Sequence, residues 1–371
     1  MNTQTTGMTY ADAGVDYDPL DLFKVECQQK AKETAVNLKQ HNLEEIEASR
    51  GESAYLMQTV NGEIIAHVEE GLGTKNLVAD IMYGKVGRSY YDQLAQDTVA
   101  MIVNDMITLG VPPVSVAMHL AVEDGSWLKD ERRRKDLVDG WAAACMKAGC
   151  VWAGGETPAL KHIIKPAASL LSGSAIGFTM DDSLVFHSED IKDGDRIVVL
   201  ESSGIHANGL TLARKIAEVM PQGYLTRSQA GRYYGDVLLD PTPIYVPFVR
   251  KCQDAGIPIR YAINITGHGW RKLMRAKEPF NYIITTMPSE KEIFQMIQKW
   301  GGVDEREMYA NYNMGAGFAV ILGGGVGDAI DIAKEDGFVA FDAGFVVKST
   351  EKRVVIEPKD IIFNAETLAV R

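Results

Sequence analysis

Apolar positions recur along the chain with two spacings, which predict helices and strands in turn. The clearest helical pattern covers residues 89–110, where apolar side chains return every three or four positions until glycine and proline end the run. Further helices are expected over residues 20–40 and through the 130s and 140s. Short stretches rich in branched side chains predict strands. In the first half of the chain these are residues 62–70, 114–122, 150–160 and 171–180.

The second half repeats one local plan of strand, glycine loop and helix. It occurs in residues 196–220, 261–275 and 313–337, without the fixed period of a repeat protein. Because 371 residues exceed the roughly 250 to 300 at which one core stops growing, two domains are expected. The polar stretch near residue 181 is the best boundary. The predicted organisation is an N-terminal arm (1–55), an N-terminal α+β domain (56–181) and a C-terminal α+β domain (182–371).

Composition and charge exclude several kinds of partner. The net charge of −12 disfavours a nucleic-acid surface and an anionic membrane surface. No stretch reaches the roughly 18 apolar residues of a membrane span, and the first residues lack the basic start and apolar core of a secretory signal, so we expect a cytoplasmic protein. The four cysteines show no metal-binding or disulfide spacing, and we expect them to be reduced.

Glycine loops between strands and helices are candidates for holding an anion. Such a loop frees backbone N–H groups at a helix start, where the helix dipole favours negative charge. Residues 71–75, 202–209 and 266–269 fit this description, although each alone is more typical of a tight turn. The first is not a Walker A motif, because no hydroxyl residue follows Lys75. The glycines at 323–329 miss the dinucleotide-binding register, so no nicotinamide or flavin site is expected there.

Single carboxylates stand close to these loops. Glu70, Asp105 and Glu156 lie at element ends or on a polar helix face, and Asp97 shares its helix face with Asn104 seven residues later. Magnesium needs only one or two protein carboxylates when substrate phosphates complete its shell. Scattered acids beside anion loops are therefore typical of an ATP site. The loop histidines are open to two interpretations, as surface residues or as site residues.

The motifs in their order resemble a known family, the aminoimidazole ribonucleotide synthetases, also called phosphoribosylformylglycinamidine cyclo-ligases. The resemblance runs through nearly the whole chain. It is carried by "YADAGVDYD", "GLGTK", "DTVAMIVNDMITLGVPP", "AGCVWAGGET", "GDRIVVLESSGIHANGLTLARKI", "LLDPTPIYV", "AINITGHG", "EMYANYNMGAGFAVIL" and "KRVVIE". It implies two α+β domains and a homodimer whose N-terminal domains pair into a shared β-barrel. It also implies that ATP phosphorylates the formamide oxygen of formylglycinamidine ribonucleotide, after which the amidine nitrogen closes the imidazole ring.

The resemblance assigns expected roles to the motif residues. Carboxylates that would hold Mg²⁺ are Glu70, Asp97 and Asp105. Residues that would surround the nucleotide are Gly71, Gly73, Thr74, Lys75, Asn104, Thr266 and Gly267. Residues that would face the reacting centre are Glu156, His206, Asn208 and His268. The expected ligands are ATP with Mg²⁺ and a small ribose-phosphate substrate.

Some positions depart from the family pattern. Glu70 stands where an aspartate is usual, and His268 stands where a glycine is usual. A glycine- and phenylalanine-rich loop before residue 62 is missing, and the residues after "GGET" lack the usual acid and methionine. Because these changes fall at substrate-contacting places, two alternatives stay open beside the cyclo-ligase. One is an ATP-dependent enzyme of the same fold that acts on another substrate, and the other is a non-catalytic homodimeric relative.

Overall fold

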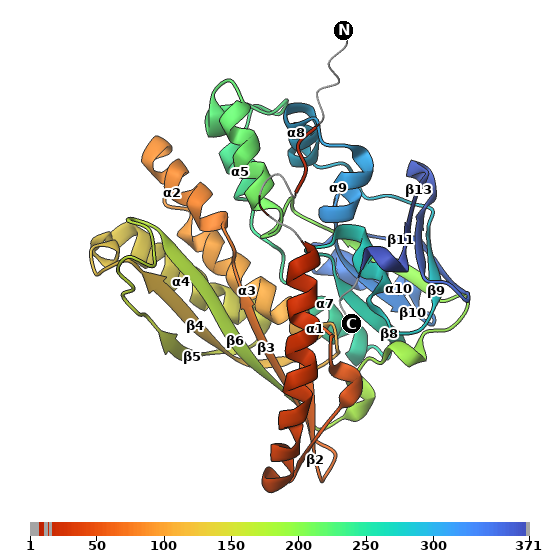
Figure 1. Ribbon diagram of the computed structural model, residues 1–371. Coiled ribbons are helices and arrows are strands. Elements are labelled where there is room, and N and C mark those ends of the chain that lie inside the picture. The colour runs from red at the N-terminus through yellow and green to blue at the C-terminus, as the bar shows by residue number, and fades with distance from the viewer. Residues whose placement is uncertain (1–6, 11–13, 15–16, 369–371) are drawn as a thin grey trace.

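The computed structural model describes residues 7–10, 14 and 17–368, whose helices and strands gather around two β-sheets (Figure 1). Within these residues the first sheet has six strands in the order β1-β2-β3-β6-β4-β5. They are β1 (Leu43–Glu45), β2 (Tyr55–Thr59), β3 (Ile64–Gly71), β4 (Pro113–Val122), β5 (Val151–Glu156) and β6 (Ser169–Thr179). The helices of this half are α2 (Lys75–Val86), α3 (Tyr91–Ile107) and α4 (Glu131–Ala148). The predicted strands and helices of this half are confirmed.

Strand β6 shows how the sequence gives this sheet one covered and one open face. Its odd-numbered residues are buried, whereas Leu170, Ile176 and Phe178 are 45%, 51% and 40% exposed. On the covered face, a Cβ at Gly177 would lie 2.6 Å from the Sδ of Met106 in α3, so glycine is what allows the helix to come this close. The alternation therefore leaves three apolar side chains and two serines, Ser172 and Ser174, on the open face.

The second sheet has seven strands within the described residues, in the order β13-β12-β9-β11-β7-β10-β8. They are β7 (Arg196–Glu201), β8 (Ile259–Asn264), β9 (Phe280–Ile284), β10 (Ala316–Leu322), β11 (Ala340–Lys348), β12 (Arg353–Ile356) and β13 (Ile361–Asn364). Its helices are α5 (Leu210–Val219), α6 (Tyr234–Leu238), α7 (Val246–Asp254), α8 (Glu292–Gly301), α9 (Glu305–Asn311) and α10 (Val326–Glu335). Antiparallel pairs dominate both sheets, as in an α+β fold.

Helix α3 joins the two halves of the chain. It packs on β3 and β6 of the first sheet and also contacts α7 and β8 of the second half. The polar face that the spacing of Asp97 and Asn104 predicted is turned toward this second half, and both side chains are fully buried. Asn104 accepts a hydrogen bond from the backbone N–H of Tyr245 at 2.9 Å and donates one to the carbonyl of Pro243 at 2.8 Å. One helix therefore belongs to the cores of both halves.

The first 55 residues form more than an arm. Helix α1 (Tyr17–Thr34) and the 3-10 helix η1 (Ala35–His41) confirm the helical pattern over residues 20–40, but Leu22 and Phe23 are 63% and 64% exposed. Strand β1 pairs with β2, so this segment also supplies the edge of the first sheet. The motif at residues 10–18 lies partly outside the described residues.

The segment after β8 differs from the prediction. A helix was expected there, and the structure has the 3-10 helix η7 (Gly269–Arg275). In a 3-10 helix, residues three apart lie directly above one another, so Lys272 and Arg275 project from the same side. Other 3-10 helices connect the elements: η2 (Glu47–Ser49), η3 (Trp127–Lys129), η4 (Asp182–Leu184), η5 (Ser188–Asp190), η6 (Gly223–Leu225), η8 (Glu357–Lys359) and η9 (Ala365–Thr367). Across residues 17–368 and the short N-terminal stretches described, no helix is long and apolar enough to cross a bilayer.

Candidate functional site

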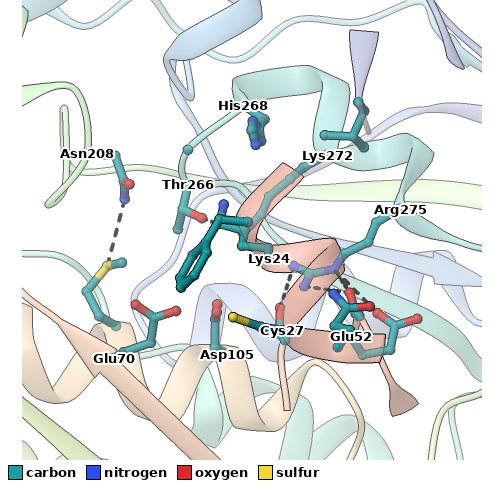
Figure 2. A pocket seen from close by; sticks show the side chains of 17 residues that line it. Lys24, Cys27, Glu52, Glu70, Asp105, Asn208, Thr266, His268, Lys272 and Arg275 are labelled. Carbon is teal, nitrogen blue, oxygen red and sulfur yellow. Dashed lines mark hydrogen bonds and ion pairs between the residues drawn. The ribbon is translucent and has the colours of Figure 1, made fainter. Parts of the chain in front are cut away.

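A pocket of about 570 Å³ lies where the two halves and helix α1 meet (Figure 2). Its walls come from the end of β3, from α3, from the loop after β8, from η7 and from α1. The lining residues are Phe23, Lys24, Cys27, Gln28, Gly51, Glu52, Ser53, Glu70, Met101, Asp105, Asn208, Thr266, Gly267, His268, Lys272, Arg275 and Leu368. Six residues singled out from the sequence are brought together here: Glu70, Asp105, Asn208, Thr266, Gly267 and His268.

Two carboxylates, those of Glu70 and Asp105, form one side of the pocket (Figure 2). Glu70 is the last residue but one of β3, and Asp105 lies near the end of α3, which packs on β3. Asp105 is 5% exposed and accepts a hydrogen bond from Asn264 Nδ2 at 2.6 Å. Burial, and then the charge of Asp105, raise the pKa of Glu70 to about 7, against the opposing pull of Lys272. Burial thus disfavours the charged form of Glu70, and the neighbouring charge of Asp105 adds to the effect.

The opposite side of the pocket is basic and carries the loop after β8 (Figure 2). Lys272 donates hydrogen bonds to the carbonyl of Asn264 at 3.2 Å and to the hydroxyl of Thr266. Burial lowers the pKa of Lys272, although the charge of Asp105 works in the other direction. Arg275 donates to the carbonyl of Gly51 at 2.9 and 3.1 Å, which ties η7 to the segment before β2.

The loop at residues 71–75 does not line the pocket. Gly71 ends β3 and pairs with Ser172 of β6, while Gly73 takes a left-handed conformation with φ of 72°. Thr74 precedes α2, and its side chain makes no capping hydrogen bond. Lys75, expected beside a phosphate, is fully buried and donates to the carbonyl of Asp240 at 2.8 Å. None of these four residues lines the pocket: Gly71 and Gly73 are exposed elsewhere, and Lys75 is buried.

Asp97 is the partner of Lys75, not a neighbour of the other two expected metal ligands. Its Oδ2 lies 2.7 Å from Lys75 Nζ, and neither side chain is exposed. Its Oδ1 accepts hydrogen bonds from the backbone N–H and the hydroxyl of Thr242, at 2.8 and 2.5 Å. The three carboxylates therefore separate into a pocket pair and a buried ion pair. Asn104, expected near the nucleotide, is likewise used to join the halves.

Two residues expected at the reacting centre lie outside the pocket. Glu156 is exposed at the end of β5, an edge strand of the first sheet. His206 is fully buried with φ of 60°, and neither ring nitrogen has a hydrogen-bond partner among the described residues. Burial, and then the charge of Lys75, lower the pKa of His206 to about 3, so the ring is neutral at physiological pH. Asn208, two residues on, reaches the pocket beside Met101.

Four charged pocket residues were not expected from the sequence: Lys24, Glu52, Lys272 and Arg275. Lys272 and Arg275 could have been predicted from the sequence, since they stand three apart directly after a glycine loop that can hold an anion. Lys24 and Glu52 had none, because they reach the pocket through contacts between distant parts of the chain. No cluster of three or more metal-ligating side chains occurs in the part of the chain that the structure describes.

Comparison with known proteins places the chain in a family. The family described as AIR synthase related protein, N-terminal domain, matches residues 51–179, and its C-terminal domain counterpart matches residues 192–357. The chain is 32% identical over 331 residues to the phosphoribosylformylglycinamidine cyclo-ligase of Methanothermobacter thermautotrophicus, covering 88% of this chain and 91% of that protein. It is 32% identical over 358 residues to the protein of the same name from Carboxydothermus hydrogenoformans, covering 94% and 98%.

A solved structure agrees at the level of the fold. AaThiL complexed with AMPPCP and TMP superposes with a TM-score of 0.55 at 13% sequence identity, covering 84% of this chain and 89% of that one. At this identity the likeness concerns only the arrangement of helices and strands. The two matching family domains and the cyclo-ligase relatives extend the agreement to the sequence itself, and the resemblance read from the motifs is confirmed. The chain belongs to the AIR synthase related family.

Proposed function

We propose that this protein is an ATP-dependent phosphoribosylformylglycinamidine cyclo-ligase, which converts formylglycinamidine ribonucleotide to aminoimidazole ribonucleotide and releases ADP and phosphate. The observation that carries the proposal is the similarity from end to end, which covers about nine-tenths of both chains for relatives bearing that name. Fold likeness alone would not be enough, since one fold hosts many activities. A place in purine biosynthesis accords with the expected cytoplasmic location.

In the proposed reaction the main task of the protein is to position its ligands. The formamide oxygen is a poor leaving group, and phosphorylation by ATP makes it a good one before the amidine nitrogen closes the ring. Catalysis of this kind depends on holding the reacting groups together and on offsetting phosphate charge. Thr266 and Asn208 bring hydrogen-bonding side chains to the pocket across from the Glu70 and Asp105 carboxylates (Figure 2).

The carboxylate pair fits a magnesium ion that accompanies ATP. Glu70 and Asp105 supply two oxygen-bearing side chains whose mutual repulsion a divalent cation would relieve. Magnesium typically takes one or two carboxylates and completes its shell with water and substrate phosphates. When bound there, the ion would offset the charge of the transferring phosphoryl group. Asn264 holds the Asp105 carboxylate in place from the second half of the chain.

The open face of the first sheet supports a homodimer. Ile176 pairs across the sheet with Ser115, and Ser115 pairs with Val151, so these side chains share one face. Val151 and Ile176 are 57% and 51% exposed, and Leu170 and Phe178 extend the apolar surface. Ser172 and Ser174 lie between Leu170 and Ile176 on this face, so the exposed apolar side chains gather around Val151, Ile176 and Phe178. Exposed apolar side chains grouped in this way mark an interaction site. We propose that two copies bury these faces against each other, as in the β-barrel that the family resemblance implies.

The test is an ADP-release assay with formylglycinamidine ribonucleotide, ATP and Mg²⁺, coupled to detection of the aminoimidazole product. Stoichiometric ADP and aminoimidazole ribonucleotide would support the proposal. Binding of ATP without turnover of this substrate would instead favour a relative that activates a different oxygen. Absence of Mg²⁺-dependent ATP binding would leave only a non-catalytic role.

A further inference from the structure

Helix α1 supplies one wall of the pocket although it is loosely attached to the rest of the chain. Phe23, Lys24 and Cys27 line the pocket from this helix, as Figure 2 shows for Lys24 and Cys27. In Figure 1 the helix lies across the seam between the two halves. Its outward residue Leu22 is 63% exposed. A helix with so little buried apolar surface depends on a few specific contacts to stay in place.

The contact that holds the helix at the pocket runs through Asp21. This side chain is only 10% exposed, and its Oδ2 lies 3.5 Å from Nε2 of His268 in the loop after β8. Its Oδ1 lies 3.0 Å from Nζ of Lys24 on the next turn of the helix. Asp21 thus joins the loop to the helix and orients Lys24 at the same time.

His268 makes this contact from a strained backbone conformation. His268 has φ of 65°, a left-handed conformation that glycine adopts freely and that costs other residues roughly 1 kcal/mol or more. The fold therefore holds a side chain at this position despite the strain. The imidazole is neutral, because burial and the charges of Arg271 and Lys272 lower the pKa of His268 to about 2. A neutral ring beside Asp21 acts as a docking contact rather than as a proton donor to substrate.

Positive charge is concentrated at this end of the pocket, in a chain whose net charge is −12. The charges of Lys24, Lys272 and Arg275 all act on His268, and those of Lys24 and Arg275 act on Lys272. Arg275 is engaged by the carbonyl of Gly51 and by the nearby carboxylate of Glu52. Lys24 is paired with Asp21, and Lys272 donates to Asn264 and Thr266. Because an ammonium group carries three donors, each lysine keeps at least one for an anion in the pocket, one from α1 and one from η7.

We propose that Lys24 and Lys272 form a subsite for a phosphate group of the bound ligand, and that the contact between Asp21 and His268 brings Lys24 to it. The proposal deepens the proposed function and rests on this pocket being its ligand site. Two ligands could bring the phosphate: the polyphosphate of the nucleotide, which arrives with magnesium, or the phosphate monoester of the ribonucleotide, which arrives without it. In either case both lysines contact the same anion, and His268 is a positioning residue.

The test measures binding rather than turnover, so it stands whether or not the cyclo-ligase activity is found. Calorimetry would compare MgADP and metal-free ribose 5-phosphate on the full chain and on Lys24→Met, Lys272→Met and Lys24→Arg. The matched control is Lys30→Met, because Lys30 lies on α1 but is 80% exposed and pairs with Glu33. Loss of one charge-assisted hydrogen bond predicts about tenfold or more weaker binding of one probe in both methionine variants. We expect Lys24→Arg to retain affinity and the control to match the unaltered protein.

The probe that weakens identifies the source of the phosphate. Weaker MgADP alone indicates the polyphosphate, and weaker ribose 5-phosphate alone indicates the monoester. Unchanged affinity for both probes in the methionine variants, or failure of both probes to bind the unaltered protein, would overturn the proposal.

The positioning role has its own readout in the thiol of Cys27, which is exposed on α1 and lines the pocket. The bound probe should slow its alkylation by iodoacetamide. In Asp21→Asn and His268→Gly that protection should fall together with probe affinity, while circular dichroism stays native. Full protection of Cys27 and unchanged probe affinity in both variants would contradict the positioning role of the contact between Asp21 and His268.

Discussion

Replacing Asp97 by asparagine should cost this protein a large part of its stability. The change leaves the ammonium of Lys75, which is completely buried, with the Asp240 carbonyl at 2.8 Å but without its counter-charge. Breaking a buried ion pair by removing one partner costs about 3 to 5 kcal/mol, because an uncompensated charge stays in the interior. The hydrogen bonds from Thr242 can persist, since asparagine keeps an acceptor oxygen. The charge of Lys75 therefore accounts for most of the expected loss.

The assay is urea unfolding followed by circular dichroism for Asp97→Asn, Lys75→Met and the double variant. Because the two side chains act as a pair, the double variant should lose less than the sum of the single losses, by about 2 kcal/mol or more. Lys85→Met is the matched control, since Lys85 lies on the same helix as Lys75 but is exposed. Losses below about 1 kcal/mol in Asp97→Asn, or strictly additive losses, would refute the reasoning. Retained stability with lost Mg²⁺-dependent nucleotide binding would restore Asp97 to the metal site that its motif implied.

Three further predictions concern the pocket and the open sheet face. Asp105→Asn should lower turnover about 100-fold or more while changing unfolding free energy by less than about 1 kcal/mol, because asparagine still accepts the hydrogen bond from Asn264; near-normal turnover would remove Asp105 from the metal site. Since the native pKa of Glu70 is raised to about 7, the folded protein binds its proton more tightly than the unfolded chain does, and this contribution to stability is lost as pH rises from about 4.5 through 7. Without nucleotide and Mg²⁺, the unaltered protein should therefore lose up to about 3 kcal/mol relative to Glu70→Gln between pH 5 and pH 8 in urea unfolding, and an equal difference at both pH values would contradict the shift. Phe178→Glu should shift the mass measured by light scattering from dimer to monomer while the circular dichroism spectrum stays native, and an unchanged dimer would place the interface elsewhere.

The sequence predicted the elements of the fold better than the contents of the pocket. Periodicity located α3 and the strands β3, β4, β5 and β6, because each is built from a local pattern that burial reinforces, but it missed β1 and β2. Glu70 and Asp105 were found for a related reason, since they stand at the ends of such elements. Where a side chain points depends on contacts that periodicity does not contain.

Lys75 and Lys24 illustrate the two errors that follow from this limit. Lys75 stands in a glycine-rich motif typical of phosphate binding, yet the approach of Asp97 from α3 takes its charge into the core. Lys24 belongs to an ordinary polar helix turn, yet docking against a loop more than 200 residues away carries it into the pocket. Both positions are set by contacts between distant parts of the chain, so no local sequence pattern could have predicted them.

Helix α3 sets a limit on how ligands enter and leave. One helix is built into both cores, and Asn104 hydrogen-bonds to Pro243 and Tyr245 of the second half. A hinge motion that separates the two halves is therefore not expected. We expect the walls formed by Glu70, Asp105 and the loop after β8 to keep their spacing when a ligand binds. Ligands would therefore enter and leave by movement of α1, the least anchored wall of the pocket. The rate at which α1 detaches would then limit the rate of product release.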